Sequence, residues 1–429
     1  MSQNERFCPA CGNPLPDGKK PKYCPECGMD LSDRLEEVKE TEATSAPVEE
    51  ASTEQVVPSR TVAKKSAKPK KKKSKAGRVV ATVILLLIVI SSGGFAFLVL
   101  VTWDNLAGQG SYVHPGPGST ESAWIFEVET AEMVNLTFTS NLSAPEVSID
   151  IDYDVSGAFL KGQTIADYYN ETFDNASAVK KFSLERKNNW NFMVFDRTVV
   201  TITLREDVNY SLTVWIVTGS INLEIPDNQT LDKLNVSSVT GSLSLTIGNN
   251  VSISGSTDFN TVTGSVNADI GNVNFAEGID IRVVTGSVNA DLIDSIIGGN
   301  SNVVTTTGSL DISLANVTYT QDVSLNFETV TGSVDLDIVQ LVDIGANITS
   351  VVDVVTGSIG VNYQGNSTLN GTGVYFVGDT TTGSVNYDNQ GGFTQAGPMF
   401  FSTGYSSGNY YDFDLDTVTG SVDVEGLMV

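Results

Sequence analysis

The tripeptide Thr-Gly-Ser recurs nine times in the second half of this 429-residue chain and restricts the fold more than any other feature of the sequence. The copies begin at Thr218, Thr240, Thr263, Thr285, Thr307, Thr331, Thr356, Thr382 and Thr419. Successive copies are 22, 23, 22, 22, 24, 25, 26 and 37 residues apart. A period near 22 that grows by whole-residue insertions indicates stacked repeats, in which loops absorb the insertions.

Strand-like segments flank every copy of the tripeptide. Each copy is followed by an aliphatic residue and then by alternating polar and apolar residues, as in Val266–Ile270. Each copy is preceded by a β-branched run, as in Ile281–Val284. This period of two excludes a helical repeat and predicts a strand, a corner, a strand and a loop in each unit. We therefore expect a mainly β chain in which residues 199–429 form a parallel β-solenoid with rungs of about 22 residues.

The glycine of the motif indicates a corner where the backbone takes a conformation that side chains forbid. Stacking of the copies places the neighbouring threonine and serine hydroxyls in ladders along the repeat axis. A phosphate-cradling loop is the functional alternative, but no helix follows the motif and it contains no lysine. We interpret the motif as architecture.

With these corners and flanking strands, residues 199–425 resemble the adhesin-type β-solenoid domain of bacterial and archaeal surface proteins, whose members carry recurring Gly-Ser or Gly-Asp corners. The resemblance covers about half of the chain. It implies a surface domain with a role in adhesion, and it names no ligand.

Acidic residues recur on the strand that follows each corner. The second and fourth residues after each corner serine face outward if the aliphatic residues face inward. Nine of these eighteen positions are Asp or Glu. Stacked carboxylates repel one another, and Ca²⁺ takes about six to eight oxygen ligands in loose geometry. We therefore consider a calcium site whose ligands are Asp269, Asp291, Asp311, Asp335 and Asp337. The alternative is a hydrated, solubilising face, because the sequence contains no DxDxDG loop.

The step of 37 residues between the last two corners contains an insertion, 388–411, that is rich in glycine, serine and aromatic residues. Exposed aromatic rings stack on sugars and supply contact area at low entropic cost. The insertion is therefore either a contact site or an end cap that shields the open edge of the solenoid from strand pairing.

Residues 104–198 lack the corner motif but contain alternating runs at Trp124–Val128, Val134–Phe138 and Val147–Ile151. We predict a β-rich, membrane-proximal region there.

Residues 79–103 contain no formally charged side chain. This length is enough to cross a hydrocarbon core of about 30 Å as one tilted helix. A signal peptide is disfavoured because 78 residues precede the segment. A soluble core helix is also disfavoured, because a soluble helix of this length carries a polar face and this segment has none. We predict a single transmembrane helix.

A basic flank orients this predicted helix. The residues that form it are Lys64, Lys65, Lys68, Lys70, Lys71, Lys72, Lys73, Lys75 and Arg78. Asp104 follows the span, and the next basic residue is Lys161. The positive-inside rule then places the N-terminus in the cytoplasm and the acidic C-terminal part outside the cell membrane. Binding of the basic run to anionic lipid or to nucleic acid is the alternative interpretation.

Glycosylation sequons support this orientation. Twelve N-x-[ST] sequons follow residue 104, about twice the number expected from composition, and none precedes the span. This distribution predicts a glycosylated exterior.

All four cysteines lie near the N-terminus, in two CxxC pairs: Cys8, Cys11, Cys24 and Cys27. Four thiolates on two tight turns are the ligand set of a structural Zn²⁺. Two disulfides would require an oxidising compartment, which the predicted topology denies. Residues 7–29 resemble the short zinc ribbon found at the start of many archaeal and bacterial membrane proteins. We assign 1–30 to this ribbon and 31–78, which lacks aromatic residues, to a disordered tether.

Charge and histidine content limit the function. The formal net charge of −26 comes from the part beyond residue 78, so the predicted exterior does not bind nucleic acid. His114 is the only histidine, and beyond residue 206 only Lys233 and Arg282 are basic. We therefore expect no enzyme but a surface protein that binds an extracellular glycan or protein, or has a structural role. The alternatives are a carbohydrate-active β-helix enzyme and a protein that signals through the zinc ribbon.

Overall fold

The computed structural model of the chain describes residues 102–116, 121–187, 194–367, 372–403, 405 and 408–429. The chain divides into two compact units, Met1–Ser74 and Lys75–Val429, and every described residue belongs to the second. The predicted zinc ribbon, the tether and residues 79–101 of the predicted span lie outside the described residues. Within the described ranges, no helix has the length and apolar character needed to cross a membrane.

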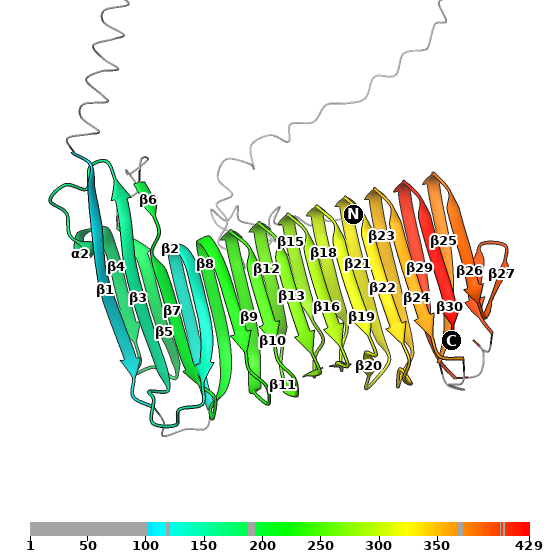
Figure 1. The fold of residues 1–429 in the computed structure, drawn as a ribbon, viewed down its shortest axis with the longest axis horizontal. Helices are drawn as coiled ribbons and strands as arrows, with labels where there is room; N and C mark the ends of the chain where they lie inside the picture. The colour runs from blue at the N-terminus through cyan, green and yellow to red at the C-terminus, as the bar shows by residue number, and fades with distance from the viewer. Residues whose placement is uncertain (1–101, 117–120, 188–193, 368–371, 404, 406–407) are drawn as a thin grey trace, which may run out of the picture. The chain divides into compact units, whose positions relative to one another are not determined.

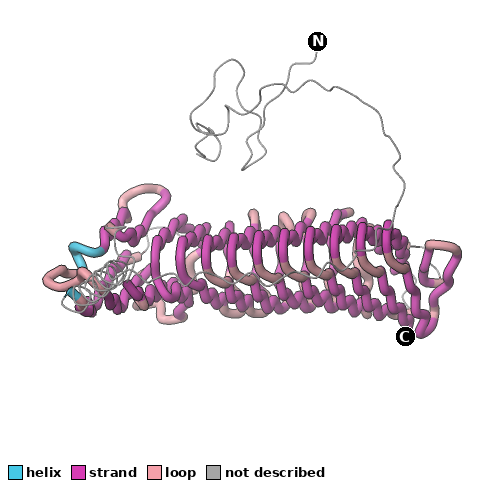
Figure 2. The backbone as a smooth tube through the Cα atoms, turned by 90° about the horizontal axis from the view of Figure 1, so that it is seen from above, coloured by secondary structure: helices cyan, strands magenta, loops and turns pink. Residues whose placement is uncertain are grey.

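The described part of the chain is mainly β, as the sequence predicts. Thirty strands of these residues join in one hydrogen-bonded sheet, accompanied by the short helix α2 (Ile165–Tyr168). Figure 1 shows the strands side by side in a row, and Figure 2 shows α2 at one end of that row.

Each Thr-Gly-Ser corner lies between a strand that enters it and a strand that leaves it. In β8 (Asn209–Ile225) the two strands are continuous across the corner. The next entering strands are β9 (Thr230–Thr240), β12 (Thr257–Thr263), β15 (Asp280–Thr285), β18 (Ser301–Thr307), β21 (Val323–Thr331) and β23 (Ile348–Thr356). The leaving strands are β10 (Leu243–Ile247), β13 (Val266–Gly271), β16 (Val288–Ile293), β19 (Leu310–Ala315), β22 (Val334–Gln340) and β24 (Ile359–Gly365). Shorter strands follow four of them: β11 (Val251–Ile253), β14 (Val273–Phe275), β17 (Ile296–Ile297) and β20 (Thr318–Tyr319).

Corresponding strands of successive repeats pair in parallel and in register. β13 pairs with β10 on one side and with β16 on the other, so that Leu243, Val266 and Val288 lie in one line. β15 pairs in the same way with β12, where Thr263 lies opposite Thr285. Equivalent residues of successive repeats therefore form straight columns across the sheet.

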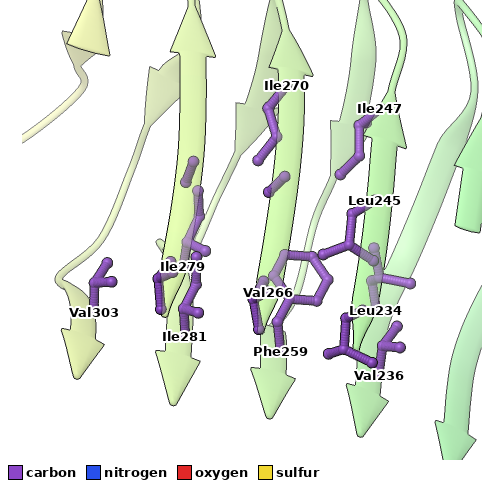
Figure 3. Packing of buried hydrophobic residues seen from close by; sticks show 14 of the residues in the cluster. Leu234, Val236, Leu245, Ile247, Phe259, Val266, Ile270, Ile279, Ile281 and Val303 are labelled. Carbon is purple, nitrogen blue, oxygen red and sulfur yellow. The ribbon is translucent and has the colours of Figure 1, made fainter. Parts of the chain in front are cut away.

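Alternate side chains of these strands point into one apolar interior. In β13, Val266 and Ile270 are buried, whereas Asn267 and Asp269 are exposed. Figure 3 shows Phe259 of an entering strand and Val266 of a leaving strand among the buried side chains that fill this interior. The predicted period of two is confirmed here.

The corners have the backbone conformation that the motif predicts. Gly264 has a φ of +142°, and a Cβ added to it would lie 2.1 Å from the carbonyl oxygen of Gly241 in the preceding repeat. The predicted serine ladder is also present. The backbone N–H of Ser265 donates to Oγ of Ser242 at 3.2 Å, and that of Ser287 donates to Oγ of Ser265 at 3.2 Å.

A second hydroxyl ladder lies two residues before the motif, where the sequence analysis expected only strand. The buried Thr261 donates from Oγ1 to the carbonyl oxygen of Gly241 at 3.0 Å. Thr329 donates in the same way to Gly308 at 3.0 Å. These bonds give the backbone carbonyl oxygens of the corner glycines a hydrogen-bond partner.

The last repeat does not stack in chain order. Its strands β29 (Asn409–Thr419) and β30 (Val422–Met428) lie between the two preceding repeats. β29 pairs with β23 on one side and with β25 (Thr372–Thr382) on the other. β30 pairs with β24 and with β26 (Val385–Gly391). The chain therefore turns back at the end and inserts its final repeat into the stack.

The segment between the last two corners forms a hairpin of β27 (Phe393–Ala396) and β28 (Met399–Ser402). β28 pairs antiparallel with β25, the outermost entering strand. Phe393, Phe400 and Tyr411 are buried in this end of the stack. This packing favours the end-cap interpretation for these three rings.

Residues 104–198 extend the same sheet beyond the first repeat, and the predicted alternating runs lie in its strands. β2 (Glu121–Thr139) pairs in parallel with β8, from Glu121 opposite Asn209 to Leu136 opposite Leu223. On its other side, β2 pairs with β5 along its first half and with β7 along its second half. The remaining strands of this region are β1 (Asp104–His114), β3 (Val147–Gly157), β4 (Tyr169–Asp174), β5 (Val179–Arg186), β6 (Val194–Asp196) and β7 (Val199–Arg205).

Candidate functional site

The five aspartates considered as calcium ligands are all exposed on strands that leave the corners. They fall into two columns. Asp269 lies opposite Asp291 in the first column, which Asp337 continues two repeats later. Asp311 lies opposite Asp335 in the second column.

Electrostatic coupling is concentrated at the later end of these columns. Partial burial raises the pKa of Asp335, and the negative charges of Asp311 and Asp337 raise it further. Neighbouring strands are about 4.8 Å apart, so stacked carboxylates repel one another. The structure therefore brings Asp311, Asp335 and Asp337 together, while Asp269 and Asp291 form a separate pair earlier in the stack.

In the ranges that the structure describes, no group of three or more His, Cys, Asp or Glu side chains is arranged to hold a metal ion. Straight columns point neighbouring carboxylates in one direction, whereas a Ca²⁺ shell needs oxygens that converge. The four cysteines considered as zinc ligands lie outside the described residues.

A further carboxylate column, which the sequence analysis missed, lies on the entering strands. In the order of the sheet its members are Glu328, Asp353, Asp416 and Asp379, each opposite the next. Partial burial raises the pKa of Asp416, and Asp414, Asp353 and Asp379 raise it further. The sequence signal is an acidic residue three positions before the motif threonine, but the insertion of the last repeat determines which residues become neighbours.

At the same end, three tyrosines remain partly exposed beside the hairpin. The ring centroids of Tyr375 and Tyr405 are 5.1 Å apart, and those of Tyr405 and Tyr410 are 5.6 Å apart. The aromatic residues of the end therefore divide into a buried set that forms the cap and a partly exposed set.

A buried polar network lies near the opposite end of the sheet. The carboxylate of Glu146, 1% exposed, accepts a hydrogen bond from the hydroxyl of Ser122. Nζ of Lys180 lies 4.0 Å from the same carboxylate and donates to Ser122 at 2.8 Å. Nε2 of His114 lies 3.7 Å from Glu146; burial lowers the pKa of this imidazole, and the carboxylate partly offsets that effect. The network connects residues of β1, β2 and β5, so we assign it a structural role.

No protein-family model matches the sequence, and no curated protein matches it. Two crystal structures align with most of the chain. One is a candidate cell adhesion protein from Clostridium sporogenes, with 12% identity, 75% of this chain and 99% of that chain covered, and a TM-score of 0.19. The other is a candidate adhesin from Bacteroides fragilis, with 11% identity, 75% and 97% covered, and a TM-score of 0.29.

Proposed function

We propose that the chain is a single-pass protein of the cell membrane that displays an acidic parallel β-solenoid outside the cell, with an adhesin-like binding role or a structural one. The observation that carries the proposal is the uniform parallel register of the repeats, with equivalent residues at steps of about 22. Such a stack presents flat faces of regularly spaced side chains, which suit contact with a partner along their length.

The membrane part of the proposal rests on the uncharged segment 79–103 and its basic flank. Protease added to intact cells should remove everything after Asp104 while a tag at the N-terminus survives. Lysed cells are the control, in which both parts should be digested. Survival of the C-terminal part on intact cells, with loss of the N-terminal tag after lysis only, would contradict the topology.

We propose a binding or structural role in place of catalysis. A polysaccharide lyase needs cations to neutralise a uronate, and beyond residue 206 the sequence offers only Lys233 and Arg282. Signalling through the zinc ribbon would require clustering of several copies of the protein, because a single helix with a long tether transmits a conformational change poorly. Release of reducing sugar from polysaccharide by the purified protein would contradict the non-enzymatic proposal.

The proposal includes one structural Zn²⁺ held by Cys8, Cys11, Cys24 and Cys27. Metal analysis of the reduced, freshly purified protein should find one zinc per chain. Cys24→Ser should abolish zinc binding and leave the thermal unfolding of the β unit unchanged, because Cys24 belongs to the other compact unit of the chain, Met1–Ser74. A zinc-free wild-type protein would contradict the ribbon assignment.

The proposal for Ca²⁺ concerns Asp269, Asp291, Asp311, Asp335 and Asp337. A specific site should raise the unfolding midpoint in millimolar Ca²⁺ well beyond the effect of NaCl at equal ionic strength. Mg²⁺ is the second control, because it demands a stricter octahedral shell. Equal shifts in all three salts would mean screening, and the calcium proposal would then be wrong.

A further inference from the structure

Trp215 projects from the outer face of β8. Its side chain is 40% exposed, whereas its neighbours Val214 and Ile216 are buried, so the indole points away from the core. Among the described residues, no other aromatic ring packs against it. The positions in line with it in the next two repeats hold Ser237 and Asn260, which are small or polar. The indole is therefore not part of a repeating apolar column.

The indole borders a surface hollow of about 330 Å³ where β5, β2 and β8 pair. Glu127 of β2 lies opposite Trp215 on one side and opposite Ser183 on the other. The polar residues of the wall are Glu127, Glu129, Ser183, Glu185 and Arg186. A hollow of this size is at the small end of ligand sites and matches one monosaccharide unit.

The wall combines hydrogen-bond acceptors with an apolar ring. Carboxylates accept strong hydrogen bonds from hydroxyl groups. Glu127 is also oriented by an ion pair, with Nζ of Lys181 2.7 Å from its carboxylate. A pyranose ring presents both an apolar C–H face and a rim of hydroxyl groups, and this combination matches an indole with polar groups at its side.

The charge of the hollow selects among sugars. Glu127, Glu129 and Glu185 line it and outnumber Lys181, the cation that pairs with Glu127, while the buried Nε of Arg186 lies on the side of Tyr168. A uronate, a sialic acid or a phosphorylated sugar would be repelled there, whereas a neutral or amino sugar would not. Two other hollows of the described chain carry carboxylates without a ring: one is lined by Asp353, and the other by Asp150.

We propose that this hollow is a carbohydrate subsite that holds one pyranose unit of a neutral or amino-sugar glycan, with Trp215 as the stacking platform and Glu127 as a hydrogen-bonding partner. The inference rests on the proposed adhesin-like function and names its ligand class.

The test uses the purified full-length protein in a detergent without a sugar headgroup. The neutral probes are cellohexaose, mannohexaose and chitohexaose. The amino-sugar probe is the hexamer of glucosamine, and the acidic probe is hexagalacturonate. Each probe is titrated by calorimetry. We expect binding of at least one neutral or amino-sugar probe and none of hexagalacturonate. Trp215→Ala should weaken the Kd about tenfold, and Trp215→Phe, which keeps a ring, by less.

Trp103→Ala is the matched control. Trp103 is 39% exposed, like Trp215, but lies beside Phe195, with ring centroids 6.3 Å apart. Its substitution should leave the Kd unchanged. No binding of any neutral or amino-sugar probe, binding of hexagalacturonate alone, or an unchanged Kd in Trp215→Ala would overturn the inference. Protease protection on intact cells would instead contradict the proposed surface function, whatever the purified protein binds.

Discussion

A methyl group at a Thr-Gly-Ser corner would collide with the backbone of the preceding repeat. At Gly264 the added Cβ would lie 2.1 Å from a carbonyl oxygen, and the φ of +142° is itself unfavourable for a side chain. We expect Gly264→Ala to lower the free energy of unfolding by about 3 kcal/mol, because strain and overpacking add. Chemical denaturation measures the change.

Gly162→Ala separates these two costs. Gly162 has a φ of +81°, but nothing lies within 4 Å of its added Cβ. Only the conformational cost remains, about 1 kcal/mol. Equal losses of stability at Gly162 and Gly264 would contradict the role assigned to close stacking.

An apolar cavity of about 30 Å³ lies inside the stack, lined in part by Ala290. The column of Ala290 holds the larger Ile312 in the next repeat. We expect Ala290→Val to raise the free energy of unfolding by about 0.7 kcal/mol, because each Å³ of cavity costs about 24 cal/mol. Ala268→Val is the control, since Ala268 is buried in the same column but does not line the cavity. A similar gain in stability in both variants would mean that the higher β-propensity of valine, and not cavity filling, is responsible.

Single residues of the motif were predictable because local backbone geometry determines them. A glycine that recurs at every corner indicates a positive φ there, and Gly264 has one. The hydrogen bond from Thr261 to Gly241 was not predictable, because two repeats must be stacked before the acceptor is in reach. Trp215 follows the outward alternation of its strand, but its partners Glu127 and Ser183 come from a region without the repeat.

Among the strands, repulsion between Asp311 and Asp335 opposes the stacking of β19 on β22. The pKa of Asp335 is raised in the folded chain, so its contribution to stability is present below the unfolded pKa of 3.8 and is lost as the pH rises through the folded pKa. We expect Asp335→Asn to stabilise the fold at neutral pH by about 0.5 kcal/mol. At about pH 3, where the carboxyl group is protonated in both states, the gain should vanish.

Glu224→Gln is the control for this prediction. Glu224 is exposed on β8 and lies opposite Thr246, so it has no acidic neighbour in the next repeat. Its substitution should change the stability little at either pH. Unfolding curves at the two pH values measure both variants, and a gain for Asp335→Asn that is independent of pH would contradict the repulsion argument.

The strands themselves follow from the sequence, but the order of the last ones does not. Alternation and corner spacing predict β13 and its equivalents. Each strand buries every second residue against the same apolar interior, and the sequence of that strand alone shows which residues these are. β29 carries the same pattern as β25, so either could pair with β23. The observed order of β23, β29 and β25 depends on the long-range packing of the hairpin β27–β28. The periodicity of the sequence does not encode this packing.

At the scale of the whole molecule, a stack of similar repeats must protect its ends, because an open edge strand can pair with another chain. The hairpin β27–β28 covers part of β25, with Phe376 opposite Phe400. The backbone N–H of Thr403 donates to the carbonyl oxygen of Gly392 at 3.0 Å, so the two ends of the hairpin already meet. A short Gly-Ser linker can therefore replace Phe393–Ser402 without pulling on the stack.

We expect this replacement to leave the repeats folded and to cause concentration-dependent association, because β25 and the buried rings around Phe376 become exposed. Analytical ultracentrifugation measures the association, and circular dichroism checks the strand content. Adding Val377→Lys to the replacement should reduce the association, since a charge on an edge strand disfavours pairing. A shortened chain that stays monomeric and folded but no longer binds cells would contradict the cap and assign the hairpin to the contact surface.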